Sequence, residues 1–312
     1  MPDLQRQVSS RITPTGSLKL DFALGNGGIP GGSIVEILGP DSSGTTSLCL
    51  SLMAQANRQG SACAFIDSDL SLTHSHLKAF NVDPQLTYIS QISQTEQALD
   101  MIERLIQSHA FGIIFLDSIN SLVPASELLL PLTINQVSKS DRLLSRALSK
   151  FEMLLRQTEK TLVITNHKQP IRGAIYHELA KNTSRLAIQF HAAIRMHLEF
   201  KSLIKENQII KGFQIQVNLK KNRFGPCPQA TKLDIMYNDG IVKFGDILDL
   251  GLYLRILTNS SNRIYYQGQL LGASYQQSLL FLKAAPHISL EIEKEIRQLL
   301  FSEEPCGRQE DR

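Results

Sequence analysis

A nine-residue loop at positions 39–47 carries the residue types and spacing best suited to chemistry. It follows an apolar run at 34–38, typical of a buried strand, and precedes a helical pattern at 48–56. In such a strand–loop–helix unit, backbone N–H groups and the helix N-terminus can wrap the phosphates of a nucleotide. The sequence therefore predicts a nucleotide-binding loop made of Gly39, Pro40, Asp41, Ser42, Ser43, Gly44, Thr45, Thr46 and Ser47.

The loop departs from the G-x-x-x-x-G-K-[ST] pattern at one position, because Thr45 stands where the lysine belongs. Thr46 occupies the position of the hydroxyl that binds Mg²⁺. A charge-assisted hydrogen bond contributes roughly 1.5–3 kcal/mol. Its loss weakens nucleotide binding by about 10- to 100-fold. The alternative is a glycine-containing turn that holds no ligand.

Carboxylates follow two other apolar runs. Asp117 ends the run at 112–117, and we interpret it as a second Mg²⁺ residue because parallel strands end at one sheet edge. Asp67 and Asp69 follow the run that begins at Ala62, and either is a candidate general base for a water. Polar residues that merely cap strand ends are the alternative for all three.

His167 directly follows a fifth apolar run at 161–166. It is a candidate sensor of a γ-phosphate, or a cap of the turn. No second His, Cys or carboxylate stands at metal-ligand spacing beside it, so the sequence argues against a zinc site.

Basic residues recur in two patterns. Arg142, Arg146 and Lys150 are spaced i, i+4, i+8 on one helix stripe, opposite Leu143, Leu144, Leu148 and Leu155. With Lys168, Arg172, Lys181 and Arg185 they are candidates for a nucleic-acid backbone track, or they form a solvated helix face. Lys220, Lys221 and Arg223 form a basic group that either reaches a neighbouring subunit's nucleotide or is a charged turn.

Short apolar runs alternate with helical patterns from 34 to 166, which predicts an α/β fold whose mainly parallel sheet is flanked by helices. Strand patterns at 193–200, 212–219 and 231–237 predict an antiparallel extension. Helical patterns at 245–257, 273–284 and 289–300, with a hairpin at 264–268, predict a small α+β domain. The expected organisation is an arm at 1–12, a core at 13–240, a C-terminal domain at 241–301 and a disordered tail at 302–312. Two stretches without regular pattern, 125–139 and 168–185, are predicted to be functional loops.

Composition narrows the class of protein. The 312 residues are 42% hydrophobic and 20% charged, which is ordinary for a globular chain. A net charge of +3 is too small to indicate nucleic-acid binding by itself, so any such site must be local. Four cysteines without C-x-x-C spacing favour reduced thiols, and we see no signal peptide or membrane span. The expectation is a soluble, cytoplasmic protein.

With these features in place, the chain resembles the bacterial RecA recombinase family over about residues 12 to 301. The matching segments are TGSLKLD at 15–21, IVEI at 34–37, GPDSSG at 39–44, AFID at 64–67, EQAL at 96–99, LDS at 116–118, LKKNR at 219–223 and GDILDLG at 245–251. Their order, spacing and extent make the match more specific than the loop alone.

The resemblance implies a RecA-like phosphate-loop core that binds ATP and Mg²⁺, forms filaments and binds single-stranded DNA through the two irregular loops. It implies that Asp117 lies near Mg²⁺, that Tyr237 lies against the adenine, and that Lys221 and Arg223 approach a neighbour's nucleotide. DNA recombination and repair within the response to DNA damage (SOS) would be the cellular role, with a homo-oligomer or a co-filament with a RecA-type recombinase as the assembly.

The departures from the family gather around one reaction. Thr45 replaces the lysine, Asp69 stands in place of the catalytic glutamate, and His167 stands in place of a glutamine. Further departures are Ser184-Arg185 for a glycine pair, Thr73 and His76 for adenine-facing residues, and the missing long amino-terminal helix. We therefore expect impaired ATP hydrolysis. The alternative is an accessory pseudo-ATPase that regulates a true recombinase or a repair polymerase.

Overall fold

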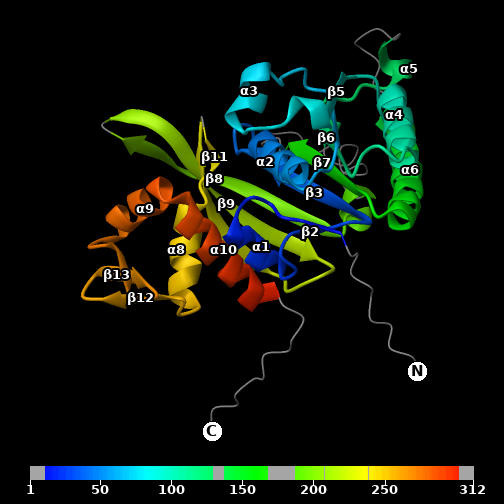
Figure 1. Ribbon diagram of the computed structural model, residues 1–312. Coiled ribbons are helices and arrows are strands. Elements are labelled where there is room, and N and C mark those ends of the chain that lie inside the picture. Colours follow the sequence, from blue (N-terminus) through cyan, green and yellow to red (C-terminus); the bar gives the residue numbers. More distant parts are fainter. Residues whose placement is uncertain (1–10, 129–136, 168–186, 207, 238, 302–312) are drawn as a thin grey trace, which may run out of the picture.

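A nine-stranded sheet forms the centre of the computed structural model, which describes residues 11–128, 137–167, 187–206, 208–237 and 239–301 (Figure 1). The strand order is β11-β10-β9-β8-β3-β7-β6-β4-β5. Strands β3, β7, β6, β4 and β5 run parallel, β8 joins them parallel to β3, and β9, β10 and β11 extend the sheet antiparallel. The bounds are β3 (Ser33–Gly39), β4 (Cys63–Asp67), β5 (Thr87–Gln91), β6 (Ile113–Asp117), β7 (Thr161–His167), β8 (Ile194–Glu206), β9 (Ile209–Asn222), β10 (Gln229–Met236) and β11 (Gly240–Ile241).

Helices cover both faces of this sheet. On one face lies α2 (Thr45–Arg58), and on the other lie α4 (Thr95–Gln107) and α6 (Val137–Thr158) (Figure 1). Shorter elements are α1 (Leu18–Leu24), α3 (His74–Ala79), α5 (Ala125–Leu128), the 3₁₀ turns η1 (Pro84–Leu86) and η2 (Ile119–Ser121), and the paired strands β1 (Ile12–Thr13) and β2 (Ile29–Pro30).

The inner parallel strands are mainly apolar because alternate side chains enter two separate cores. Phe65 and Phe115 face α2, with ring centroids 5.9 Å apart. Their neighbours Ile66 and Leu116 face α4 and α6. Side chains alternate across a strand, so a strand covered on both faces must be apolar throughout. The sheet edge that carries the loop at 39–47 is therefore anchored by two cores.

A smaller unit follows the sheet in sequence and has a hydrophobic cluster of its own. It comprises α8 (Phe244–Tyr253), β12 (Leu257–Ser260), β13 (Arg263–Tyr266), β14 (Gln269–Gly272), α9 (Tyr275–Ala284) and α10 (Pro286–Phe301). Polar contacts tie it to α1 and the residue before it: Ser17 Oγ donates to Asp246, Lys19 pairs with Asp246 and Asp249, and Arg297 Nη2 donates to Asp21 Oδ2 at 3.0 Å.

The predicted fold class is confirmed: a mostly parallel sheet flanked by helices, with an antiparallel extension. Two expected segments are wrong in detail. The helix predicted at 245–257 ends at Tyr253, and Leu257 already begins a strand. The stretch 125–139 is not wholly irregular, because α5 lies within it and α6 begins at Val137.

The predicted arm at 1–12, apart from Arg11 and Ile12, and the predicted tail at 302–312 lie outside the described residues. The division into domains at 240 and 241 stays a prediction. Cys49 and Cys63 are buried and form no disulfide, as expected. Within the described ranges, no helix has both the length and the apolar character needed to span a bilayer.

Candidate functional site

The loop at 39–47 connects β3 to α2 and has the backbone shape of an anion cradle. Ser42 and Gly44 have positive φ angles of 61° and 86°, which turn the chain sharply before α2. Gly44 is the N-cap of α2, and no side chain caps the helix. Uncapped N–H groups at a helix N-terminus attract anions.

Two further details fit a bound phosphate group. The Ser43 hydroxyl is fully buried and has no hydrogen-bond partner among the described residues. A buried polar group normally has a partner, so this hydroxyl is suited to one that binds from outside. A Cβ atom at Gly39 would collide with Ser43 Oγ, so a larger residue there would displace this hydroxyl.

Thr46 and Asp117 meet across the sheet edge, as expected for residues that share a cation. Thr46 Oγ1 donates to Asp117 Oδ2 at 2.6 Å. Asp117 is 1% exposed, and Thr165 donates a hydrogen bond to its other oxygen. Burial raises the pKa of Asp117, and the nearby charge of Asp69 adds to this rise, whereas the hydrogen bonds from Thr165 and Thr46 oppose it. These two residues have the oxygen donors that Mg²⁺ prefers.

Asp69 lies beside this pair, and side chains from other positions contact both of its oxygens. Oδ1 accepts from Ser118 Oγ at 3.0 Å and from Ser121 Oγ, and Oδ2 lies 3.3 Å from His167 Nε2. A general base needs an accepting oxygen directed at the water it activates. The arrangement around Asp69 therefore disfavours that role.

Asp67, the other candidate base, has a local structural role. Its carboxylate accepts hydrogen bonds from the N–H groups of Ser71 and Leu72 at 3.2 and 3.1 Å. Thr73 and His76 likewise contact each other, because they form the capping box of α3. Asp67, Thr73 and His76 thus form hydrogen bonds with backbone groups close to them in the chain.

His167 closes the site from the end of β7. Its backbone N–H donates to Asn120 Oδ1 at 2.7 Å, and its Nδ1 lies 3.4 Å from Asp41 Oδ1 of the loop. The histidine thus lies between the loop and Asp69. The sequence has no second His, Cys or carboxylate at metal-ligand spacing from this histidine, but in the fold ligand atoms of Asp69, Asp117 and His167 all lie within 4.8 Å of one another. They are far apart in sequence, and only the parallel strand ends bring them together.

Thr45 is 5% exposed at the start of α2. Its short, neutral side chain cannot supply the charge of a lysine. Ser47 lies two residues further on in α2 and is partly exposed. The loop therefore offers backbone amides and hydroxyls to a ligand, without a cationic side chain.

Tyr237 is 49% exposed and packs against Phe213, with ring centroids 5.8 Å apart. Phe213 in turn lies next to the loop, because its Cε2 atom is 3.2 Å from the position of a Cβ at Gly44. A chain of aromatic contacts thus links Tyr237 to the loop. The sequence analysis missed Phe213, whose position next to a strand glycine gave no signal.

Lys221 and Arg223 lie away from the loop of their own chain. In the sheet, Lys221 of β9 lies opposite Arg195 of β8, and Arg195 lies opposite Glu36 of β3. Glu36 precedes Gly39 by three residues. The Lys221 ammonium donates to the carbonyl groups of Gln189 and Phe190 at 2.9 Å. Arg223 contacts Glu152 at 3.2 Å and the Phe190 carbonyl at 3.0 Å. Any contact of these two side chains with a nucleotide would have to be with that of another subunit.

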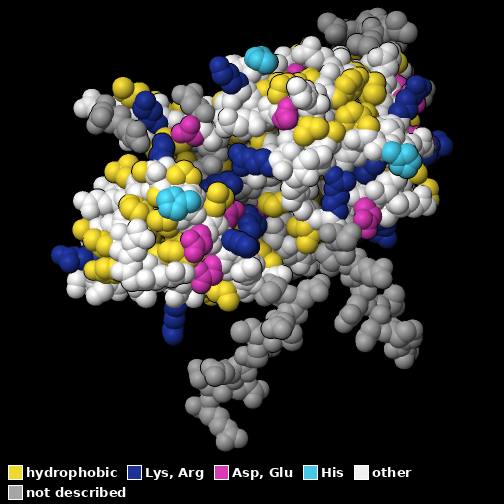
Figure 2. Space-filling view, in the orientation of Figure 1, with side chains coloured by type: hydrophobic (Ala, Val, Ile, Leu, Met, Phe, Trp, Pro, Cys, Tyr) yellow, Lys and Arg dark blue, Asp and Glu magenta, His cyan; other side chains and the backbone are white. Residues whose placement is uncertain are grey.

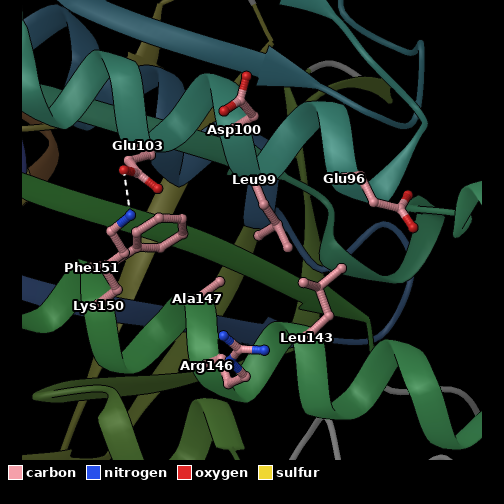
Figure 3. Close-up of a pocket in the computed structure, with 9 residues that line it drawn as sticks. All are labelled: Glu96, Leu99, Asp100, Glu103, Leu143, Arg146, Ala147, Lys150 and Phe151. Atoms are coloured by element: carbon pink, nitrogen blue, oxygen red, sulfur yellow. Dashed lines mark hydrogen bonds and ion pairs between the residues drawn. The ribbon is translucent and has the colours of Figure 1, made fainter.

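The predicted stripe of exposed basic residues on α6 is only partly present. Arg142 and Arg146 are exposed, but Lys150 Nζ donates to Glu103 of α4 at 2.5 Å. Figure 3 shows this pair beside a cleft of about 320 Å³ between α4 and α6, with Arg146 on its α6 side. Leu143 is not on the buried side as predicted: it is 36% exposed and lines the same cleft. Leu144, Leu148 and Leu155 are buried as predicted.

The other basic candidates, Arg172, Lys181 and Arg185, lie outside the described residues. On the face shown in Figure 2, basic side chains lie in small groups with acidic and hydrophobic side chains between them. Among the described residues, that face has no continuous basic track.

Sequence reasoning also missed the hydroxyl residues that hold the carboxylates in place. Thr165 is a buried polar residue within the apolar β7, and Ser118 and Ser121 follow β6. A polar residue within a buried strand is a usable signal for Thr165. Only the folded chain reveals the two serines.

Comparison with known proteins gives consistent matches. The model of a family described as RecA N-terminal domain matches residues 3–242. Protein RecA of Rickettsia massiliae (strain Mtu5) is 38% identical over 291 residues, which cover 93% of this chain and 85% of that protein. Protein RecA of Desulforapulum autotrophicum is 34% identical over 298 residues, which cover 96% of this chain and 86% of that protein.

Among solved structures, the chain is similar to the one titled "Crystal structure of the RadB recombinase". The TM-score is 0.54 at 18% identity, and the match covers 74% of this chain and 99% of that chain. This likeness shows the fold alone.

Proposed function

Because the chain belongs to the RecA family of recombination and repair proteins, we propose that it binds ATP·Mg²⁺ at the loop 39–47 and binds single-stranded DNA, with impaired hydrolysis of ATP. One observation carries the proposal. Thr46 and Asp117 lie in contact beneath a loop that has kept its backbone shape, while position 45 has lost its cation.

The residues present are better suited to binding ATP and Mg²⁺ than to hydrolysing ATP. Backbone N–H groups at the start of α2 and the buried Ser43 hydroxyl are suited to phosphate oxygens, and Thr46 and Asp117 would hold Mg²⁺. Mg²⁺, when bound, would neutralise charge on the phosphates. Hydrolysis needs more than binding, because phosphoryl transfer depends on positioning and electrostatic stabilisation of the transition state.

Two features argue for impaired hydrolysis. Thr45 cannot stabilise negative charge on the phosphates as a lysine would. Asp69 has one oxygen bound by serine hydroxyls and the other next to His167, so its carboxylate is poorly placed to orient a water. Either feature alone slows the reaction, and here both surround one site.

The test is ATP titration of the full chain, with and without Mg²⁺, followed by a hydrolysis assay with and without poly-dT. We expect Mg²⁺-dependent binding and hydrolysis that stays far below that of a RecA with an intact lysine, also with poly-dT. Thr46→Val and Asp117→Ala should abolish the Mg²⁺ dependence. Thr258→Val on the exposed part of β12 and Asp239→Ala are matched controls that should not change binding.

The impaired hydrolysis and the nucleotide site can each be refuted separately. Rapid hydrolysis stimulated by poly-dT would refute impaired turnover. Absence of ATP binding at any Mg²⁺ concentration would refute the nucleotide site. In that case the engaged Asp69 favours the second candidate function, an accessory protein that docks on a RecA-type recombinase or a repair polymerase without using ATP.

A further inference from the structure

Three side chains that could bind a metal converge at the ends of three adjacent strands. Asp69 follows β4, Asp117 ends β6 and His167 ends β7. One potential ligand atom from each lies within 4.8 Å of those from the other two. Ligands at about 2.1 Å in a tetrahedral shell lie about 3.4 Å apart, so rotation of the side chains would bring all three into contact with one ion.

Hydroxyl groups outside the cluster orient both carboxylates. Thr165 holds one oxygen of Asp117, and Ser118 and Ser121 hold one oxygen of Asp69. The second oxygen of each carboxylate faces inward, toward Thr46 in one case and His167 in the other. Residues that bind metals are typically oriented by such an outer layer of hydrogen bonds.

The histidine ring lies between two carboxylates. Its Nδ1 atom lies 3.4 Å from Asp41 Oδ1, while Nε2 lies 3.3 Å from Asp69 Oδ2. Nδ1 does not donate a hydrogen bond to Asp41. In the neutral tautomer with the proton on Nδ1, Nε2 carries the lone pair that would bind the ion.

The charges in the cluster call for a cation. Asp69 and Asp117 place two carboxylates close together, and Asp117 is buried. Among the described residues, no lysine or arginine forms an ion pair with either carboxylate. The loop lysine that would bring positive charge to this edge is Thr45 in this chain. Buried charges are normally paired or bound to a metal ion.

We infer that Asp69, Asp117 and His167, with the Thr46 hydroxyl, form a binding site for a divalent transition-metal ion of the Zn²⁺ or Co²⁺ type. An imidazole nitrogen among the donors favours such ions, whereas Mg²⁺ prefers an all-oxygen shell that retains water. The site shares Thr46 and Asp117 with the proposed nucleotide site, and it binds the ion without a nucleotide.

Co²⁺ is the probe, because its visible absorption reports the number and type of its ligands. We expect nucleotide-free wild-type protein to bind one Co²⁺ at this site, Zn²⁺ to displace it, and an equal concentration of Mg²⁺ to leave it in place. His167→Gln should weaken Co²⁺ binding by at least about 10-fold and change the spectrum. His109→Gln, which removes an exposed histidine beyond the end of α4, should do neither.

Asp69→Asn is the second variant, because an amide keeps the shape of the carboxylate and loses its charge. It should also weaken Co²⁺ binding, and circular dichroism establishes that both variants are folded. Equal Co²⁺ binding in wild type and His167→Gln, or none in wild type, would overturn the inference. Because nucleotide is absent, Co²⁺ binding without ATP binding would refute only the proposed function, and ATP·Mg²⁺ binding without Co²⁺ binding would refute only the metal site.

Discussion

At position 45, a single side chain separates this loop from one with a full complement of phosphate contacts. Thr45 lies at the start of α2, directly after Gly44, so a lysine there would begin next to the cradle. The backbone around it already has the required positive φ angles. What the loop lacks is charge, and charge can be restored by one substitution.

We expect Thr45→Lys to tighten ATP·Mg²⁺ binding by about 10- to 100-fold, because a charge-assisted hydrogen bond contributes roughly 1.5–3 kcal/mol. Isothermal titration calorimetry measures the change. Thr45→Ser, which adds no charge, is the control and should not tighten binding. Equal affinity of the lysine variant and wild type would mean that phosphates do not lie against this loop.

Asp21 is a buried carboxylate with a distinct pH signature. It is fully buried, and burial raises its pKa from 3.8 to about 6, although Arg297 and Thr15 oppose this rise. A folded-state pKa above the unfolded value means that the folded protein binds the proton more tightly. The contribution of Asp21 to stability is therefore complete below about pH 4 and lost as the pH rises through about 6.

The free energy of unfolding of wild type, relative to that of Asp21→Asn, should thus increase by up to about 3 kcal/mol between pH 7 and pH 4. Urea unfolding of both proteins at several pH values measures this difference, and the titration of other carboxylates cancels in it. A difference that is constant with pH, or that shrinks on acidification, would contradict the assigned pKa.

At the scale of elements, α6 serves two purposes at once. Leu144, Leu148 and Leu155 fix one face of it to the sheet, and the opposite face presents Arg142 and Arg146. Lys150 is less available, because it is paired with Glu103 of α4 (Figure 3). If α6 contributes to DNA binding, the two arginines rather than the whole predicted stripe should carry it.

We expect Arg142→Ala combined with Arg146→Ala to weaken poly-dT binding and to flatten its salt dependence. Each lost phosphate contact should reduce the slope of log K against log salt concentration by about 0.7. Fluorescence anisotropy at several salt concentrations measures the slope. Arg156→Ala, in the last turn of the same helix, removes an exposed arginine paired with Glu152 and should leave the slope unchanged. An unchanged slope in the double variant would exclude α6 from the DNA interface.

At the scale of the whole molecule, the C-terminal unit is attached to the sheet through α1 and the residue before it. Arg297 of α10 reaches Asp21 of α1, Ser17 donates to Asp246 of α8, and Lys19 lies 3.6 Å from Asp246. Leu18 packs into the hydrophobic cluster of the C-terminal unit. A short segment near the start of the described chain thus joins two separate cores.

Arg297→Ala should lower the free energy of unfolding by about 3 kcal/mol at pH 7, because it leaves the buried charge of Asp21 without its partner. The value is at the lower end for a broken buried pair, since the Arg297 side chain is 28% exposed. Arg104→Ala removes an exposed arginine paired with Asp100 and should cost less than about 1 kcal/mol. Similar losses in the two variants would show that the Asp21 contact does not hold the units together.

The fold class, the position of the loop and the missing lysine are all evident from the amino-acid sequence alone. Apolar runs of strand length and a glycine-bounded loop are local signals, since they depend only on neighbours in the chain. The similarity of Asp117 to a Mg²⁺ residue was visible because it directly follows such a run. The prediction that 125–139 lacks regular structure was wrong in part. The short helix α5 and the first residues of α6 lie in this stretch, and they lack a strong periodic pattern.

Which polar residues meet depends on how the chain folds. Asp69, Asp117 and His167 are about 50 to 100 residues apart in sequence, yet adjacent parallel strands bring their ends to one edge of the sheet. Whether Asp69 has an oxygen available, and whether Lys150 is paired, depends on side chains from other elements. Such contacts form between surfaces that the chain brings together only on folding, so no spacing along the sequence encodes them.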